Sequence, residues 1–385
     1  MFTDYMDEIL TSSDRSLSIL IGENGCGKSL TLHNMAKEGL QRYSSVIAIA
    51  TSMYDKFPRR NVSKKFHYMG SRIGRNIPRD IVKIAIGNLY DEGNKGFSSI
   101  FKVLKYVGYA ERIGVEISGI NPDFECLLLE NNEIDENIKE EILYLIKYLM
   151  NSFSMFNGYD GAITWIGINE VGMNSNGEIS RLLHLEKTLK KLKILHKIDI
   201  HITKDEYDLS MNIRYASSGE QTLIATMVFI ASFIDENTLI LIDEPENSLH
   251  PKWQREYVQT IQDIFSYYQP SIAIATHSPI LISGLHKEHN VKIFKSSHEG
   301  IERLPNVVMG AEDLYNKMFD VLTPRNRSLS DRCAILLNNF SDGKVSFAES
   351  DDELNSYIEN SFERSQLEFL HGVKRLLKKL QRNTN

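Results

Sequence analysis

The octapeptide GENGCGKS at residues 22–29 is the feature that most constrains how this chain can fold. It matches the pattern G-x-x-x-x-G-K-S, follows the apolar run SLSILI at 16–21 and opens a helical stretch at 29–43. In that context the glycines let several backbone N–H groups face one centre, and the helix N-terminus adds its positive dipole end. The segment therefore predicts a strand, a phosphate-binding loop and a helix. The residues expected to line a bound nucleotide are Gly22, Glu23, Asn24, Gly25, Cys26, Gly27, Lys28 and Ser29.

Within this loop, two side chains are suited to specific tasks. Lys28 can reach the β- and γ-phosphates of a nucleotide, and the hydroxyl of Ser29 can ligate Mg²⁺. Cys26 occupies a variable position of the pattern and reads as a small residue rather than a redox switch.

Further apolar runs predict a mainly parallel sheet with helices on its faces. They lie at 46–51, 211–216, 238–242 and 271–275, and helical stretches separate them. We expect each run to be a strand of one core sheet.

Three polar side chains follow two of these runs. Asp243 and Glu244 end the sequence TLILIDE, and His277 follows SIAIAT. The carboxyl ends of parallel strands share one edge of a sheet, where α/β proteins bind ligands. Asp243 is therefore expected to support Mg²⁺, Glu244 to polarise an attacking water, and His277 to contact the γ-phosphate.

The sequence SSGEQ at 217–221 precedes an apolar helix at 222–233. A Ser-Gly pair at a helix N-terminus can face an anion. It can also be a capping box, formed by Ser218 with Gln221 three residues later. The two interpretations are compatible, because a capped helix end can still donate to a phosphate.

The order GENGCGKS, SSGEQ, LILIDEPENSLHP and ATHSP resembles the ABC-type ATPase superfamily, with its Walker A, signature, Walker B with D-loop, and switch histidine. The segment DEPENSLHP resembles the corresponding segment of the soluble RecF-, SMC- and OLD-like ATPases more than that of transporter cassettes. The phrases IAIATSMYDKFP and EDLYNKMFDVLTPRNRSLSD are similar to ATPases of Septu and retron-associated anti-phage systems.

The resemblance implies an α/β ABC-ATPase (P-loop NTPase) sheet and a head-to-tail homodimer with two ATP molecules at its interface. Each ATP would lie on the phosphate loop of one subunit and be closed by the signature of the other. By that match, Ser218, Gly219 and Gln221 contact nucleotide, Ser29 and Asp243 hold Mg²⁺, and Glu244 and His277 are catalytic.

The sequence departs from the family pattern in three places. The family's glutamine loop is missing, since the only glutamine in that interval is Gln41 on the first helix; Asp55 or Asn61 is a candidate replacement. The signature has serine in place of leucine and Glu220 in place of a second glycine. Finally, about 15 residues precede the first strand, which leaves Tyr5 or Phe2 as a weak candidate to hold adenine.

Length and periodicity divide the chain into three parts. Residues 1–60 and 205–305 are expected to form the ATPase core. Residues 61–204 would form a basic, mostly helical inserted lobe, and residues 306–385 a helical C-terminal region that docks a partner.

The chain carries a formal net charge of −7, so contact with nucleic acid would need a local basic face. Residues 56–83 hold nine Lys and Arg side chains against Asp80 alone. Arg59, Arg60, Lys64 and Lys65 could follow a phosphate backbone, with Phe66, His67 and Tyr68 available for stacking. The alternative is a solvated loop balanced by the acidic stretch at 123–141.

Several functional classes are disfavoured. Three scattered cysteines form no metal motif or disulfide framework and favour a reduced, cytoplasmic compartment. No signal peptide or membrane-spanning run is visible, nor is an HNH or Toprim nuclease pattern. The sequence therefore predicts a slow, regulated ATPase that controls a separate effector, such as an HNH nuclease, in bacterial anti-phage defence. The alternatives are a RecF-like DNA-binding repair ATPase and a nucleotide-gated scaffold with negligible turnover.

Overall fold

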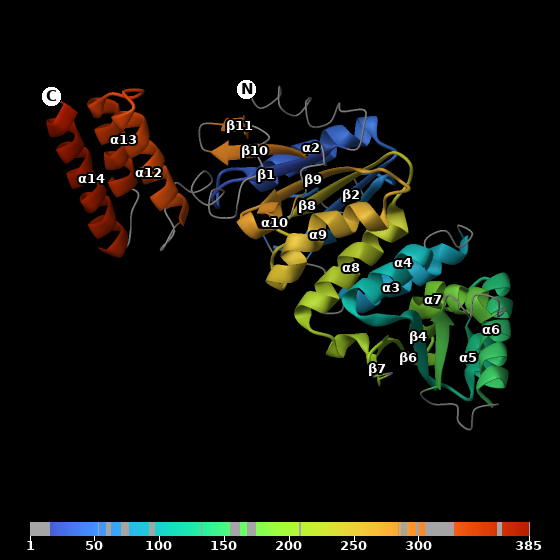
Figure 1. The fold of residues 1–385 in the computed structure, drawn as a ribbon. Coiled ribbons are helices and arrows are strands. Elements are labelled where there is room, and N and C mark those ends of the chain that lie inside the picture. The colour runs from blue at the N-terminus through green and yellow to red at the C-terminus, as the bar shows by residue number, and fades with distance from the viewer. Residues whose placement is uncertain are drawn as a thin grey trace.

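The computed structural model is built around a seven-stranded sheet with helices on both faces (Figure 1). It describes residues 16–384, apart from 53, 59–62, 71–76, 92–96, 132, 155–161, 168–174, 208, 284, 286–290, 298–299, 305–326 and 360–363. Side by side, the strands are β11 (Gly300–Leu304), β10 (Val291–Ser297), β1 (Leu17–Ile21), β9 (Ser271–Thr276), β8 (Thr238–Asp243), β2 (Ser45–Ala50) and β3 (Phe66–Gly70).

Six of these strands are parallel, and only β11, at one edge, runs antiparallel to its neighbour. The predicted strands at 16–21, 46–51, 238–242 and 271–275 are confirmed as β1, β2, β8 and β9. Their carboxyl ends are in register: Ile21 lies opposite Thr276, and Asp243 lies opposite both Ala275 and Ala50. The predicted α/β fold with a parallel sheet is therefore confirmed, and the polar residues that follow these strands share one edge.

Both faces of the central strands β1, β9, β8 and β2 are covered, which explains why these strands read as continuous apolar runs. Helix α2 (Lys28–Arg42) packs Leu32 and Met35 on the face that includes Leu20 and Leu241. Helices α8 (Ser218–Phe233) and α9 (Pro251–Ile264), followed by the short α10 (Pro279–Ser283), lie on the other face (Figure 1).

The inserted lobe contains a second, antiparallel sheet that the sequence analysis did not predict. Its strand order is β5 (Ala162–Gly167), β4 (Tyr109–Ile120), β6 (Leu195–Lys204) and β7 (Leu209–Asn212). Apolar side chains of β4 and β6 at every second position are buried in the same core as the surrounding helices. Those helices are α3 (Ile77–Asp91), α4 (Phe97–Val107), α5 (Phe124–Glu130), α6 (Glu136–Ser154) and α7 (Ser175–Lys191).

Three sequence-based expectations about this region are wrong. Residues 211–216 are not a core strand: they comprise the end of β7, the 3-10 helix η2 (Ile213–Tyr215) and Ala216. β3 lies beyond the predicted boundary at residue 61, yet it pairs with β2 in the core sheet. β7 lies beyond the boundary at 204, yet it pairs with β6 in the lobe. For β3 and β7, backbone pairing with the preceding strand, rather than local composition, decides where the segment belongs.

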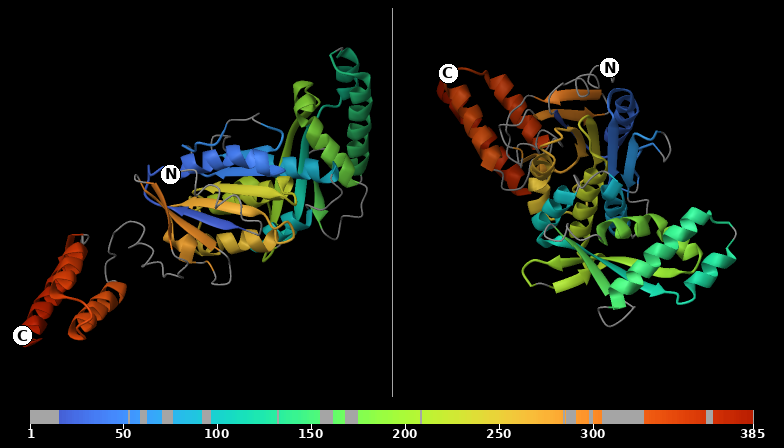
Figure 2. Two further views of the ribbon diagram at one scale, coloured as in Figure 1. Left: turned by 90° about the horizontal axis from the view of Figure 1, so that it is seen from above. Right: turned by 90° about the vertical axis from the view of Figure 1, so that its right-hand side faces the viewer.

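The C-terminal helices α12 (Arg327–Ser341), α13 (Phe347–Glu359) and α14 (Arg364–Thr384) form a small unit with its own apolar core. Leu370, Val373 and Leu377 of α14 are buried in that core, whereas Phe369 and Leu376 are exposed. This unit and the inserted lobe lie at opposite ends of the molecule (Figures 1 and 2). None of the described helices is long and apolar enough to span a membrane.

Candidate nucleotide-binding site

The phosphate loop joins β1 to α2 and holds its lysine in place. The Lys28 side chain is buried, and its Nζ donates to the carbonyl oxygens of Gly22 and Glu23, both at 2.8 Å. These bonds fix the ammonium group inside the curve of the loop. A cation in that position is suited to pair with the phosphates of a nucleotide.

The backbone of the loop requires glycine at two positions for different reasons. Gly22 has φ of 152°, and a Cβ there would lie 2.3 Å from the carbonyl oxygen of Ser296 on β10. Gly27 has φ of 93° and caps the start of α2, with open space around it. The hydroxyl of Ser296 also donates to the Cys26 carbonyl at 2.8 Å, so β10 supports the loop from behind.

Asp243, at the tip of β8, lies beside Ser29 of the phosphate loop. Its side chain is buried, and burial raises the pKa of this carboxyl to about 6, with the nearby Glu244 and Asp55 adding to the rise. Among the described residues, Oδ1 of Asp243 has no hydrogen-bond partner. A buried carboxylate with a free oxygen beside a serine hydroxyl fits a hard divalent cation such as Mg²⁺.

Glu244 follows in a left-handed conformation, with φ of 54°. Its backbone is held on two sides: its N–H donates to the Ala275 carbonyl at 2.8 Å, and its carbonyl accepts from the Thr51 hydroxyl. Nδ2 of Asn247 lies 3.3 Å from both Oε2 of Glu244 and the Thr51 hydroxyl. The carboxylate therefore has a fixed direction, as a group that must align a water molecule requires.

His277 follows β9 at the same edge of the sheet, with its side chain 40% exposed. Its Nδ1 lies 3.1 Å from Oε1 of Glu246 and 3.8 Å from Oε1 of Glu244. The same Glu246 oxygen accepts from the Thr276 hydroxyl and the His277 N–H, both at 2.8 Å. The buried Glu246 thus connects the loops after β8 and β9, a role that the sequence analysis did not assign.

The signature segment at the start of α8 is capped one residue earlier than predicted. Ser217, not Ser218, is the N-cap, and its partner is Glu220 rather than Gln221. The sequence SSGEQ satisfies the capping pattern in both registers. The amide of Gln221 instead turns back to donate to the carbonyls of Arg214 and Ala216 at 2.9 and 2.8 Å. Ser218 is exposed, so its hydroxyl is free to meet a ligand from outside.

The signature lies against the D-loop of the same chain. A Cβ on Gly219 would be 2.8 Å from the carbonyl oxygen of Ser248. A cavity of about 220 Å³ opens beside this contact. The polar residues that line it include Thr51, Ser218, Gln221, Thr222, Asn247 and Ser248. The hydrogen bonds around Glu244 therefore border the signature corner.

Only part of the predicted basic stretch lies in the described residues. Arg59 and Arg60, like Asn61, Phe2 and Tyr5, lie outside the described residues, while Lys64 and Lys65 are exposed. The expected stacking residues are wrong, because they belong to β3. Phe66 is buried, and the ring of His67 stacks on that of Phe233 with 4.1 Å between the ring centroids. The Tyr68 hydroxyl donates to Oδ2 of Asp55 at 2.8 Å. The interaction of Asp55 with Asp243 keeps it a candidate replacement for the missing glutamine.

Comparisons with known proteins found one family model and several solved structures. Residues 116–283, which include the signature, Asp243 and His277 but not the phosphate loop, match the family model described as "AAA domain, putative AbiEii toxin, Type IV TA system". Among solved structures, an ATP-binding cassette of an ABC transporter in its ADP conformation aligns with a TM-score of 0.30 and 10% identity, over 79% of this chain and 84% of that one.

Three curated relatives are informative. The Retron Vc95 probable ATPase of Vibrio cholerae serotype O1 biovar El Tor is 25% identical over 72% of this chain and 69% of its own. Septu protein PtuA of Bacillus mycoides is 22% identical over 71% of this chain, and protein ea59 of Escherichia phage lambda is 27% identical over 39%. The matches span only 36% of PtuA and 28% of ea59.

The predicted similarity to ATPases of retron systems and to a protein of a Septu system is confirmed by these matches.

Proposed function

We propose that this chain binds and hydrolyses ATP, dimerises head to tail around it, and so regulates a separate effector in anti-phage defence. The observation that carries the proposal is the placement of Asp243 of β8 beside Ser29 of the phosphate loop, with Glu244 and His277 at the same edge. A triphosphate on the loop would extend toward this group of side chains. The similarity to the Retron Vc95 probable ATPase supports the same reading.

In this proposal each side chain has a defined task. Lys28 pairs with the β- and γ-phosphates, and Ser29 and Asp243 hold Mg²⁺, which would neutralise phosphate charge. Glu244 orients the attacking water and accepts its proton. His277, supported by Glu246, faces the γ-phosphate. Because hydrogen bonds to charged groups contribute about 1.5–3 kcal/mol each, one subunit can bind ATP but a second is needed to enclose it.

The exposed position of Ser218 supports a dimer of this kind. Ser218 and the N-terminus of α8 form an anion-facing corner next to the D-loop of the same chain. In a head-to-tail dimer this corner would close over the nucleotide of the partner. Asn247 and Ser248 would then connect closure to the carboxylate of Glu244.

Phosphate release and oligomeric state test this function directly. We expect Mg²⁺-dependent phosphate release by the full chain to exceed that of Lys28→Ala, while Lys37→Ala, an exposed lysine on α2, behaves like the parent. Glu244→Gln should bind ATP, stop turnover and accumulate an ATP-dependent dimer in light scattering. The charge-matched control is Glu302→Gln on the edge strand β11.

Turnover no greater than that of Lys28→Ala would contradict the hydrolytic function and favour a nucleotide-gated scaffold. A Glu244→Gln protein that stays monomeric with saturating ATP would contradict the dimer. Purification with neighbouring gene products would test the effector: recovery of an HNH nuclease would support regulation of a nuclease, whereas salt-sensitive DNA binding by the chain alone would support the RecF-like alternative.

A further inference from the structure

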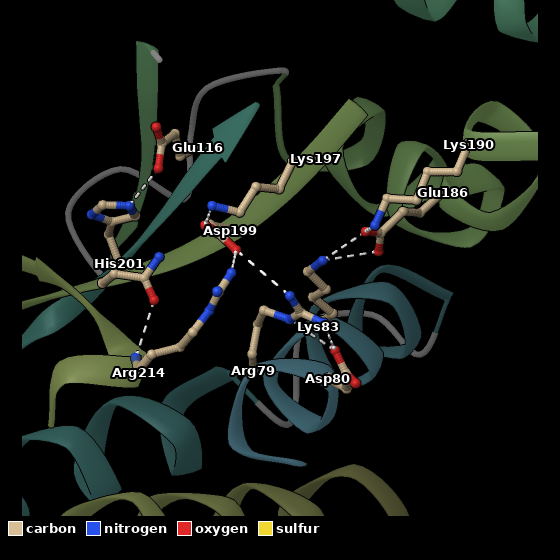
Figure 3. A network of polar contacts seen from close by, with 11 residues as sticks. Arg79, Asp80, Lys83, Glu116, Glu186, Lys190, Lys197, Asp199, His201 and Arg214 are labelled. Atoms are coloured by element: carbon tan, nitrogen blue, oxygen red, sulfur yellow. Dashed lines mark hydrogen bonds and ion pairs between the residues drawn. The ribbon is translucent and has the colours of Figure 1, made fainter. Parts of the chain in front are cut away.

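A buried carboxylate in the inserted lobe is connected to the signature segment. Asp199 lies on β6 with only 2% of its side chain exposed, and three cations surround it (Figure 3). Lys197 and Arg214 contact it directly, and Nη1 of Arg79 on α3 is 3.7 Å from its Oδ1. Burial alone would raise the pKa of Asp199, but hydrogen bonds from Lys197 and Arg214 hold it below its ordinary value.

Arg214 belongs to a short segment that is linked to the signature by its own hydrogen bonds. Its N–H donates to Oδ1 of Asn212 at 3.1 Å, and its carbonyl accepts from the amide of Gln221 at 2.9 Å. Gln221 also donates to Ala216. Residues 212–221 are therefore linked to one another by hydrogen bonds, and the ion pair of Arg214 with Asp199 attaches this segment to β6.

A second attachment lies five residues further along the same strand. Nζ of Lys204 is 2.5 Å from Oε1 of Glu220, and the other oxygen of Glu220 accepts from the Ser217 N–H at 2.8 Å. Lys204 also lies over the ring of Tyr109 on β4, 4.2 Å from its centroid. Two attachments on one strand fix both the position and the direction of the signature segment relative to the lobe.

We infer that Asp199 and Lys204 are positioning residues for the signature corner, which makes the antiparallel sheet of the inserted lobe the support that aims Ser218 at the nucleotide of a partner subunit. The inference rests on the proposed function, because it concerns closure of the dimer. Neither residue touches the phosphate loop in the described contacts, so loading of one subunit with ATP should not depend on them. A partner that shifts β6 would change closure without touching the nucleotide.

The experiment compares ATP loading with ATP-dependent dimerisation in full-length protein carrying Glu244→Gln. Loading is followed with a fluorescent ATP analogue, and dimerisation by light scattering. Asp199→Asn keeps the shape of the side chain but removes the charge that holds Arg214. We expect unchanged loading but a dimer that needs about 10- to 100-fold more protein to form, as expected for a misaligned site.

The matched control is Glu186→Gln. Glu186 is a partly buried carboxylate of the lobe, bound to Lys83 at 2.8 Å and Lys190 at 2.6 Å (Figure 3), and none of its described hydrogen bonds or ion pairs is with residues 212–221. We expect it to dimerise like the Glu244→Gln parent. Adding Arg214→Gln to Asp199→Asn restores a neutral hydrogen-bonded pair and should recover part of the loss.

Two results separate the possible failures. If the Glu244→Gln parent does not dimerise with ATP, both the proposed function and this inference are contradicted. If the parent dimerises and folded Asp199→Asn dimerises equally well, the inference alone is overturned. If Asp199→Asn does not fold, Lys204→Met is the variant to test, because Lys204 is partly exposed and its loss leaves Glu220 paired with Ser217. Unchanged dimerisation of Lys204→Met overturns the inference. Weakened dimerisation supports it.

Discussion

Asn247 holds the carboxylate of Glu244: its Nδ2 is 3.3 Å from Oε2 of Glu244 and 3.3 Å from the Thr51 hydroxyl. Glu244 therefore has one oxygen fixed by the D-loop, while the other faces His277 at 3.8 Å. The left-handed backbone at Glu244 would be costly without such support. A substitution in the D-loop should thus affect the orientation of the Glu244 carboxylate, and with it the hydrolysis step, without altering the contacts of the phosphate loop with nucleotide.

Replacing Asn247 with alanine should lower kcat about tenfold and leave KM for ATP nearly unchanged, because Glu244 loses its lateral hydrogen bond but the phosphate loop is intact. Thr51→Val should have a similar effect and Thr51→Ser a much smaller one, since serine keeps the hydroxyl. Steady-state phosphate release measures both constants. Equal loss in Thr51→Ser and Thr51→Val would contradict a role for the hydroxyl.

Asp243→Asn should stabilise the free protein while abolishing turnover. Burial raises the pKa of Asp243 from its ordinary 3.8 to about 6, so the native state retains a proton that the unfolded state has released. The unfolding free energy consequently falls as pH rises from about 4 to 6. At 1.36 kcal/mol per pKa unit, we expect the variant to gain up to about 3 kcal/mol at pH 7.

Urea denaturation without Mg²⁺ or nucleotide, at pH 4.5 and pH 7, checks this expectation. The gain should be smaller at the lower pH, where the wild-type carboxyl keeps its proton. A variant that is less stable than the wild type at pH 7 would show that the ionised carboxylate is favourable in the native state.

Gly22→Ala should destabilise the phosphate loop more than Gly25→Ala does. Both glycines have positive φ, and adopting such a conformation costs a non-glycine residue about 1–3 kcal/mol. Only at Gly22 would the added methyl group also collide with backbone, 2.3 Å from the Ser296 carbonyl oxygen, whereas Gly25 has open space. Thermal unfolding and ATP-analogue affinity should show the same order of effect. Equal losses would mean that φ alone sets the requirement.

Glu246→Ala should cost about 1–3 kcal/mol of stability, because the buried Thr276 hydroxyl and the His277 N–H lose their acceptor. Glu246→Gln keeps an acceptor oxygen but removes the charge beside Nδ1 of His277, so it should retain most of the stability and lose kcat. Glu256→Gln on α9 serves as the control. Full activity of Glu246→Gln would show that its charge is not needed to hold His277.

The core of the site was predictable because its signals are local. The runs that form β1, β2, β8 and β9 are continuously apolar, and the residues after β1, β8 and β9 carry the polar groups. One parallel sheet brings such ends together whatever the intervening chain does. The capping register of α8 was ambiguous for an equally local reason, since Ser217 and Ser218 each have a suitable partner three residues later.

The rest depends on pairings that one sequence does not specify. β10 reads VKIFKSS, and its two lysines interrupt the apolar pattern expected of a parallel strand, while β3 owes its place to pairing with β2. β4 does alternate over residues 113–118, but the partner and register of an antiparallel strand are set by distant segments. The ion pair of Asp199 on β6 with Arg214 forms where the chain turns after β7, and no spacing in the sequence indicates it.

The strand order has a consequence for how the protein folds during its synthesis. β1 and β2 are made first, yet β9 and β8, synthesised some 190 residues after β2, stand between them. β1 and β2 therefore cannot pair with β9 and β8 until residue 276 has been synthesised. Folding by this route is slow and exposes apolar strand edges to aggregation. If ATP binds at the edge of the completed sheet, as proposed, it would stabilise the folded protein against unfolding.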